Sequence, residues 1–347
     1  MTEQPESDQI ERPRAPDKEA EQWQAATQFA GHLSELPSSI LALVRVLVAD
    51  EEAGAAEASS GTKFILIRLL KSEVFRAPYY YCVSMFRPEA LRGRNRPFSI
   101  TDFLQTFSPA EHAFFTAMIF MFKKTQKSCR GAAFDEVAKH MQLGINLGWS
   151  IGSSLKELDP LLGLLVGAFR WLGTLPFLQY DPEGFESYLR HCNQNNRVLP
   201  DTNYELERWG CTSSQVGLLL TQKMGFKSSL VTPVFNGTQT SGRTPMDTRP
   251  DFICRATDIW LRHFLNENPD LNVPLPAEFY LNEADRQWIS SCIADAAPSK
   301  PLQWLFATTD DISPTQTPEL FIPDPKDQFA DVEGFKTGPD DSLLLEE

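Results

Sequence analysis

Residues 161–231 read LLGLLVGAFRWLGTLPFLQYDPEGFESYLRHCNQNNRVLPDTNYELERWGCTSSQVGLLLTQKMGFKSSLV. The stretch opens with an apolar run that continues to Arg170 and Trp171, which predicts a helix buried on nearly all sides. A second helix is indicated further on, where Thr212 precedes Gln215 by three residues in the pattern of a capping box. We therefore expect helices packed on helices at the centre of the fold.

The acidic charge of the chain is concentrated at its two ends. The 347 residues carry a formal net charge of -14 and are 42% hydrophobic, which is enough for a sizeable core. Residues 1–26 have a net charge of -4 and residues 307–347 a net charge of -9, so the central part is nearly neutral. Because phosphate binding requires clustered Lys and Arg side chains, we expect no nucleic-acid partner.

The cysteines and the apolar runs are typical of a soluble protein in a reducing compartment. The six cysteines stand singly, with no C-x-x-C pair and no cysteine–histidine cluster at zinc spacing. The amino terminus is polar and acidic, unlike a signal peptide. The longest apolar runs, residues 113–122 and 161–169, are about half as long as a bilayer span. We expect a cytoplasmic location without membrane insertion.

Apolar residues recur at helical spacing along the chain, and no strand alternation lasts long enough to build a sheet. The predicted fold class is all-α, with two helical sub-bundles joined near residues 124–133. Ser108 and Glu111 predict another capping box in the first of them. The expected segments are a disordered acidic tail (1–28), a first sub-bundle (29–128), a second sub-bundle (129–298) and a disordered acidic tail (299–347).

Residues 76–97 combine three adjacent tyrosines with five arginines. One interpretation is a surface that stacks bases and binds phosphates. The other is a solvated loop whose tyrosines pack on the core, and the nearly neutral surroundings favour this second interpretation.

The order of these segments resembles the HDOD family (HD-related output domain), a group related to the HD metal-dependent phosphohydrolases. Residues 33–47, LSELPSSILALVRVL, are similar to the helix start of the family, and residues 68–72, RLLKS, are similar to its R-L-x-N-S pattern except that Lys71 replaces Asn. Residues 98–107 resemble the next family segment more loosely. The resemblance covers roughly residues 30–298 and implies that the second sub-bundle is HD-like.

The second half carries the places where HD relatives have a metal site. In those relatives, a His, an adjacent His-Asp pair and a distant Asp hold a divalent metal whose bound water attacks a phosphate ester. The resemblance puts these places at His140, Arg170, Trp171 and Asp258, and Ser213 stands in a motif similar to E-x-x-x-G-x-x-H-x-x-V-G. A guanidinium stays protonated and an indole has no lone pair to offer, so the His-Asp pair is lost. We therefore expect no metal, no cofactor and no catalytic residue.

Two interpretations of the remaining site residues stay open. In the first, Asp258 pairs with a base, for which Arg170 is the candidate, and the pair is structural. In the second, His140, Arg170 and Ser213 line a pocket for an anion or another small ligand where the metal used to be.

The resemblance implies a non-catalytic bacterial signalling or regulatory protein that acts through protein or ligand binding. A protein partner is expected, reached through the tail 307–347, in which apolar residues alternate with acids, and a nucleotide second messenger is a further candidate ligand. The tail can instead be a passive solubilising extension. The alternative function is a metal-dependent phosphohydrolase or phosphodiesterase with non-standard ligands.

Overall fold

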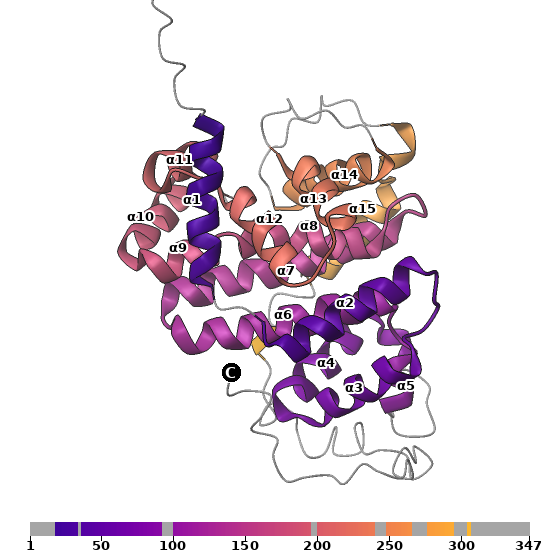
Figure 1. The fold of residues 1–347 in the computed structure, drawn as a ribbon. Helices are drawn as coiled ribbons and strands as arrows, with labels where there is room; N and C mark the ends of the chain where they lie inside the picture. Colours follow the sequence, from indigo (N-terminus) through magenta and orange to yellow (C-terminus); the bar gives the residue numbers. More distant parts are fainter. Residues whose placement is uncertain are drawn as a thin grey trace, which may run out of the picture.

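The described part of the protein consists of helices packed on helices. The structure, a computed structural model, describes residues 18–33, 36–91, 100–195, 200–239, 248–265, 276–294 and 304–306. These residues contain no strand, so the predicted all-α class is confirmed for them (Figure 1). The two expected disordered tails lie outside the described residues, apart from residues 18–28 and 304–306.

The first half of the fold is built around α6. Helices α2 and α4 pack against α6, and α3 packs against α2, α4 and α5. The bounds are α2 Ser38–Glu52, α3 Ser60–Lys71, α4 Glu73–Phe86, the 3-10 turn η1 Pro88–Ala90, α5 Ile100–Leu104 and α6 Pro109–Ser128. Every residue of α6 from Pro109 to Phe122 is buried. This agrees with a sequence that is apolar on nearly all sides of the helix.

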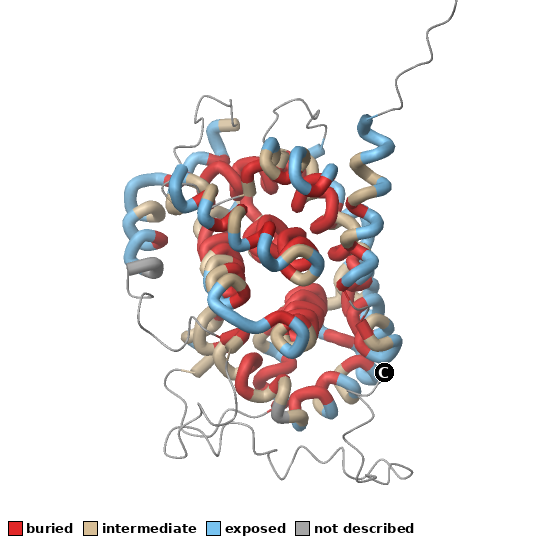
Figure 2. The backbone as a smooth tube through the Cα atoms, turned by 90° about the vertical axis from the view of Figure 1, so that its left-hand side faces the viewer, coloured by how far each residue is buried: buried red, intermediate tan, exposed pale blue. Residues whose placement is uncertain are grey.

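The second half of the fold surrounds α8. Helices α7, α12, α13 and α14 pack against α8, and buried residues line the interior (Figure 2). The chain passes from α6 to α7 at residues 129–131. The bounds are α1 Lys18–His32, α7 Ala132–Ser154, α8 Pro160–Leu172, α9 Leu175–Tyr180, α10 Pro182–Gln194, α11 Thr202–Trp209, α12 Ser213–Lys223, α13 Ser228–Thr238, α14 Arg249–Phe264, the 3-10 turn η2 Ala277–Phe279 and α15 Glu283–Ala294.

Both predicted capping boxes are confirmed. At the start of α6, the hydroxyl of Ser108 accepts from the backbone N–H of Glu111, and the Glu111 carboxylate accepts from the N–H of Ser108 at 2.8 Å. Thr212 and Gln215 make the same reciprocal pair at the start of α12. These bonds satisfy N–H groups that have no partner within the helix.

Helices α7 and α8 approach one another through glycines. A Cβ atom built on Gly144 of α7 would lie 2.6 Å from the carbonyl oxygen of Gly167 in α8. Gly148 and Gly163 face each other more closely still, so that neither position has room for a side chain. The stretch Pro160–Tyr180 is apolar and long enough to cross a bilayer, but its residues 161–178 are all buried inside the fold. The sequence predicts both helices but not this contact between them.

The expected disorder of residues 18–28 is wrong, because these residues belong to α1. The helix packs against α9 and α12, with Ala26 and Ala30 fully buried. The ammonium of Lys223 in α12 donates to the carbonyl oxygen of Ala30 at 2.9 Å. The three charged residues of this segment, Lys18, Glu19 and Glu21, are exposed and lie off the buried stripe, so the average composition hides an amphipathic helix.

Residues 304–306 also contradict the expected disorder from residue 299 onward. They form a short turn in which Trp304 and Leu305 are fully buried. Trp304 packs edge-on against Phe86 and Phe115 of the first half. An isolated Trp-Leu-Phe sequence within a polar tail gives little local signal, because its partners come from distant helices.

The tyrosine- and arginine-rich stretch is helical over α4 and not a loop there. Tyr79 is buried, contacts the hydroxyl of Thr116 and donates to the carbonyl oxygen of His112 at 3.2 Å. Arg87 lies 4.1 Å from the ring centroid of Trp149 and pairs with Glu111 at 3.1 Å. These groups serve the core, while the basic residues of 92–97 lie outside the described residues.

Candidate functional site

Arg170 and Asp258 form a buried ion pair between α8 and α14. Arg170 Nη1 lies 3.4 Å from Asp258 Oδ1, and the two side chains are 5% and 2% exposed. Asp258 Oδ2 also accepts from Nε of Arg262, one turn further along α14, at 2.8 Å. The prediction that Asp258 pairs with Arg170 is therefore confirmed. Two guanidinium groups compensate the free-energy cost of removing one carboxylate from water. An isolated buried carboxylate would lack this compensation.

His140 and Trp171 stack on each other where α7 faces the end of α8. Their ring centroids are 4.9 Å apart and the ring planes differ by 14°. Burial lowers the pKa of His140, so the neutral imidazole is favoured, although the neighbouring Glu136 acts in the opposite direction. Among the described residues, neither His140 Nδ1 nor Trp171 Nε1 has a hydrogen-bond partner. Trp171 thus faces His140, while the adjacent Arg170 faces Asp258.

Ser213 lies at the start of α12 and is bonded to Glu205 of α11. Its backbone N–H and its hydroxyl donate to Glu205 Oε2 at 2.7 Å and 3.0 Å. Glu205 is fully buried, and burial raises its pKa to about 7 even though its hydrogen-bond donors act to lower it. Sequence reasoning did not single out Glu205, because a glutamate on a short polar helix is usually solvated.

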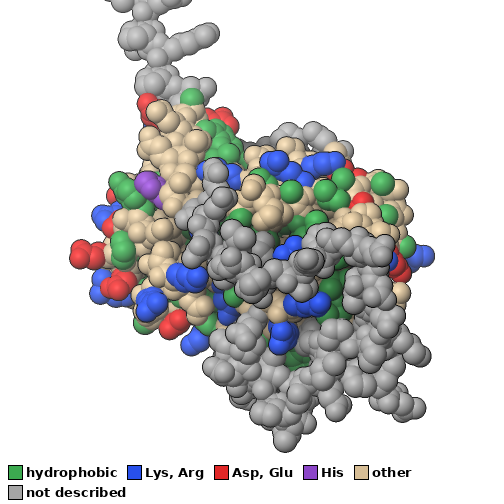
Figure 3. Space-filling view, turned by 60° about the horizontal axis from the view of Figure 1, so that its bottom comes forward, with side chains coloured by type: hydrophobic (Ala, Val, Ile, Leu, Met, Phe, Trp, Pro, Cys, Tyr) green, Lys and Arg blue, Asp and Glu red, His purple; other side chains and the backbone are tan. Residues whose placement is uncertain are grey.

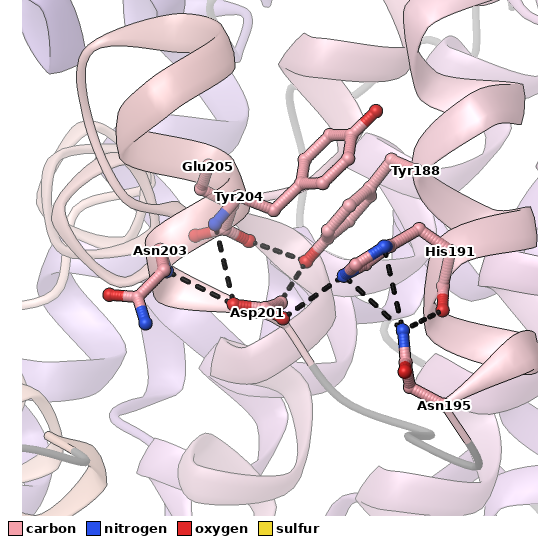
Figure 4. A network of polar contacts seen from close by, with 7 residues as sticks. All are labelled: Tyr188, His191, Asn195, Asp201, Asn203, Tyr204 and Glu205. Carbon is pink, nitrogen blue, oxygen red and sulfur yellow. Dashed lines mark hydrogen bonds and ion pairs between the residues drawn. The ribbon is translucent and has the colours of Figure 1, made fainter.

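A chain of polar contacts runs from Glu205 towards the surface (Figure 4). The hydroxyl of Tyr188 donates to Glu205 Oε1 at 2.8 Å and accepts from the backbone N–H of Asp201 at 2.9 Å. Asp201 caps α11 and lies 3.2 Å from Nε2 of His191, whose side chain is partly exposed. The only local signal for this network is the Asp-Thr-Asn sequence at the start of α11.

The contacts assign three different partners to the residues of the predicted anion pocket. His140 lies on Trp171, Arg170 lies beside Asp258, and Ser213 is bonded to Glu205. A common pocket for His140, Arg170 and Ser213 stays a prediction. The described residues include no group of three or more His, Cys, Asp or Glu side chains placed to hold one metal ion. The five cysteines with described side chains are free and buried: Cys82, Cys129, Cys192, Cys211 and Cys254.

Comparison with known proteins finds no match to this chain among protein-family models, curated proteins or solved structures. The resemblance to the HDOD family therefore rests on the sequence motifs alone. The contacts around Arg170, His140 and Ser213 have to be interpreted from their own chemistry.

Proposed function

We propose that this chain is a non-catalytic regulatory protein of HDOD type that works by binding, in the cytoplasm of a bacterium. The observation that carries the proposal is the Arg170–Asp258 pair. Asp258 is the acid that the family resemblance assigns to a metal. Its carboxylate faces two guanidinium groups, Arg170 and Arg262. A divalent cation at this place would meet positive charge in a buried setting, where repulsion is weakly screened.

The surroundings of His140 support the same proposal. His140 stacks on Trp171 at a ring-centroid distance of 4.9 Å, and Trp171 stands in the place that resembles the Asp of the His-Asp pair. This arrangement supplies an apolar partner and no second ligand.

We propose a protein partner, with the acidic segment 307–347 as one contact, and a nucleotide second messenger as a further candidate ligand. A segment in which apolar residues alternate with acids suits docking as a short peptide. On the described surface visible in Figure 3, both acidic and basic side chains are present.

The non-catalytic proposal is tested by metal analysis and hydrolysis assays on the purified full-length chain. We expect less than stoichiometric Mn, Fe or Zn, and no hydrolysis of a generic phosphodiester or of cyclic dinucleotides above a buffer control. Hydrolysis that the chain supports and His140→Ala abolishes would overturn the proposal in favour of a metal-dependent phosphohydrolase. Asp135→Asn, at an exposed position of the same helix, is the matched control variant.

The role of the tail is tested by comparing partner capture by the full-length chain and by a chain that ends after residue 306. Retention of Trp304–Phe306 keeps the described fold the same in both proteins. Loss of a captured protein with the shorter chain supports docking through the tail. Equal capture by both chains assigns the tail to solubility and moves the partner site onto the helices.

A further inference from the structure

Residues 304–306 occupy a groove between the two halves of the fold. Trp304 lies with its ring centroid 6.0 Å from that of Phe86 in α4 and 5.8 Å from that of Phe115 in α6. The opposite wall is α7, which contributes Gln142 and Asn146. Trp304 and Leu305 have no exposed surface. The segment thus fills a space that α4, α6 and α7 leave between them.

The groove recognises polar groups of its occupant as well as apolar ones. The indole N–H of Trp304 donates to Asn146 Oδ1 at 3.2 Å, and the backbone N–H of Leu305 donates to Gln142 Oε1 at 2.8 Å. Gln142 and Asn146 are four residues apart, so their side chains lie on one face of α7. They are 2% and 4% exposed. With the segment in place, its two donors satisfy these otherwise buried acceptors.

One end of the groove opens towards the surface at the α6–α7 turn. Phe306 is only partly buried and packs edge-on against Phe122, with ring centroids 5.0 Å apart. On its other side Phe122 contacts Phe134, which lines a cavity of about 310 Å³ together with Lys127 and Arg130. A peptide in the groove can therefore continue past its third residue without meeting the core.

These features are those of a receptor for a short linear motif. An aromatic anchor in a deep pocket, a neighbouring aliphatic residue and a bond to the peptide backbone together give affinity and sequence preference. We propose that the groove is a peptide-binding site, that Trp304–Phe306 is its ligand in cis, and that a partner segment of the type Trp-Leu-aromatic replaces it in trans. The biological role of this site rests on the binding function proposed above. Peptide binding to the groove can be tested independently of that function.

The test uses the full-length Trp304→Ala chain and a labelled peptide of residues 300–309, KPLQWLFATT, followed by fluorescence anisotropy. We expect saturable binding, and binding at least about tenfold weaker for the same peptide with Ala in place of Trp. Adding Gln142→Ala to the chain should weaken binding of KPLQWLFATT by roughly three- to tenfold, because one hydrogen bond is lost. The wild-type chain should bind the peptide more weakly than Trp304→Ala, because its own segment competes at a high effective concentration.

A second measurement covers the case that Trp304→Ala does not fold. A cleavage sequence for a site-specific protease is inserted after residue 298 of the otherwise wild-type chain, and the chain is cut after folding. We expect the fragment that begins at residue 299 to stay bound on a sizing column and to be displaced by excess KPLQWLFATT, but not by the Ala-substituted peptide.

Two results would overturn the proposal: a folded Trp304→Ala chain that does not distinguish the two peptides, or a cut fragment that excess peptide cannot displace. Either would make residues 304–306 a permanent part of the core. Both measurements are independent of metal content and hydrolysis. A phosphohydrolase activity would therefore overturn the proposed function and leave the peptide result in place.

Discussion

Ser213 donates both its backbone N–H and its hydroxyl to a single oxygen of Glu205, at 2.7 Å and 3.0 Å. Tyr188 donates to the other carboxylate oxygen at 2.8 Å. Helices α10, α11 and α12 are thereby joined through one buried side chain. Burial nevertheless raises the pKa of Glu205 to about 7, because three donors do not fully replace the lost hydration.

Glu205 should make stability depend on pH, and Glu205→Gln should remove that dependence. The pKa of Glu205 rises from 4.5 to about 7 on folding, so the folded state binds a proton more tightly than the unfolded state. Its contribution is fully present below about pH 4.5 and is lost as the pH rises towards 7, by about 3 kcal/mol in all. Urea unfolding at several pH values between about 5 and about 8 measures the difference between wild type and Glu205→Gln.

His112 does not disturb this comparison. Burial lowers its pKa to about 4, so its contribution is lost as the pH falls, which is the opposite direction, but it is the same in both proteins and cancels in the difference. Glu183→Gln, at an exposed position of α10, is the matched control. Parallel pH curves for wild type and Glu205→Gln would contradict the prediction.

Gly163→Ala should destabilise the protein although it adds one methyl group. A Cβ atom at this position would lie 2.8 Å from the carbonyl carbon of Gly148, and backbone atoms cannot move aside as a side chain can. We expect a loss of about 3 kcal/mol, measured by thermal or urea unfolding. Gly31→Ala is the control, because its Cβ would meet nothing within 4 Å and Ala favours the helix by up to about 1 kcal/mol. Equal effects of the two substitutions would show that α7 and α8 are not in contact.

Arg170→Met should cost more stability than Arg262→Met. Both arginines pair with Asp258, but the side chain of Arg170 is 5% exposed and that of Arg262 is 20% exposed. Removal of the deeper partner leaves the buried carboxylate with less compensation, and we expect a loss of about 3 kcal/mol. Urea unfolding of the two single variants at neutral pH measures the comparison. If Arg262→Met lowers the free energy of unfolding more than Arg170→Met does, Arg170 is not the main partner that stabilises the buried Asp258 carboxylate.

Ala30→Glu should release α1 from the rest of the fold. Ala30 is fully buried against the second half, and its carbonyl oxygen accepts from Lys223. The fully buried position of Ala30 has no room for a Glu side chain, so the helix should separate from α9 and α12. Hydrogen exchange of α1 is the measurement, and protection within Lys18–His32 should fall while that of α6 stays high. Gln28→Glu adds the same charge at an exposed position and should leave protection unchanged.

Features with a local signal could be predicted from the sequence, and features that depend on distant partners could not. Ser108 and Glu111 lie within one turn, so their capping box could be read directly. Trp304 is buried by helices that lie far earlier in the chain, so its tail looked disordered. Likewise α1 becomes a buried helix only because α12 is there to cover Ala30.

The candidate site shows the same division. Arg170 and Asp258 are distant in the chain and are the exception, because the family resemblance places both at one site. The stacking of Trp171 on His140 could not be predicted, because it depends on how closely α7 and α8 approach. Glu205 was missed for the related reason that its burial requires Tyr188 and Ser213 to converge on it.

The glycine contact between α7 and α8 has a mechanical consequence. Two helices that touch through backbone atoms have no intervening side chains that could change rotamer, so they cannot slide without losing contact altogether. The pair should move as one rigid unit, and a displacement at its start should be carried along its length. Trp149 connects this unit to the groove through Phe86, at a ring-centroid distance of 5.4 Å. A change in the groove's occupant that displaces Trp149 would therefore be carried to α7 and α8 together.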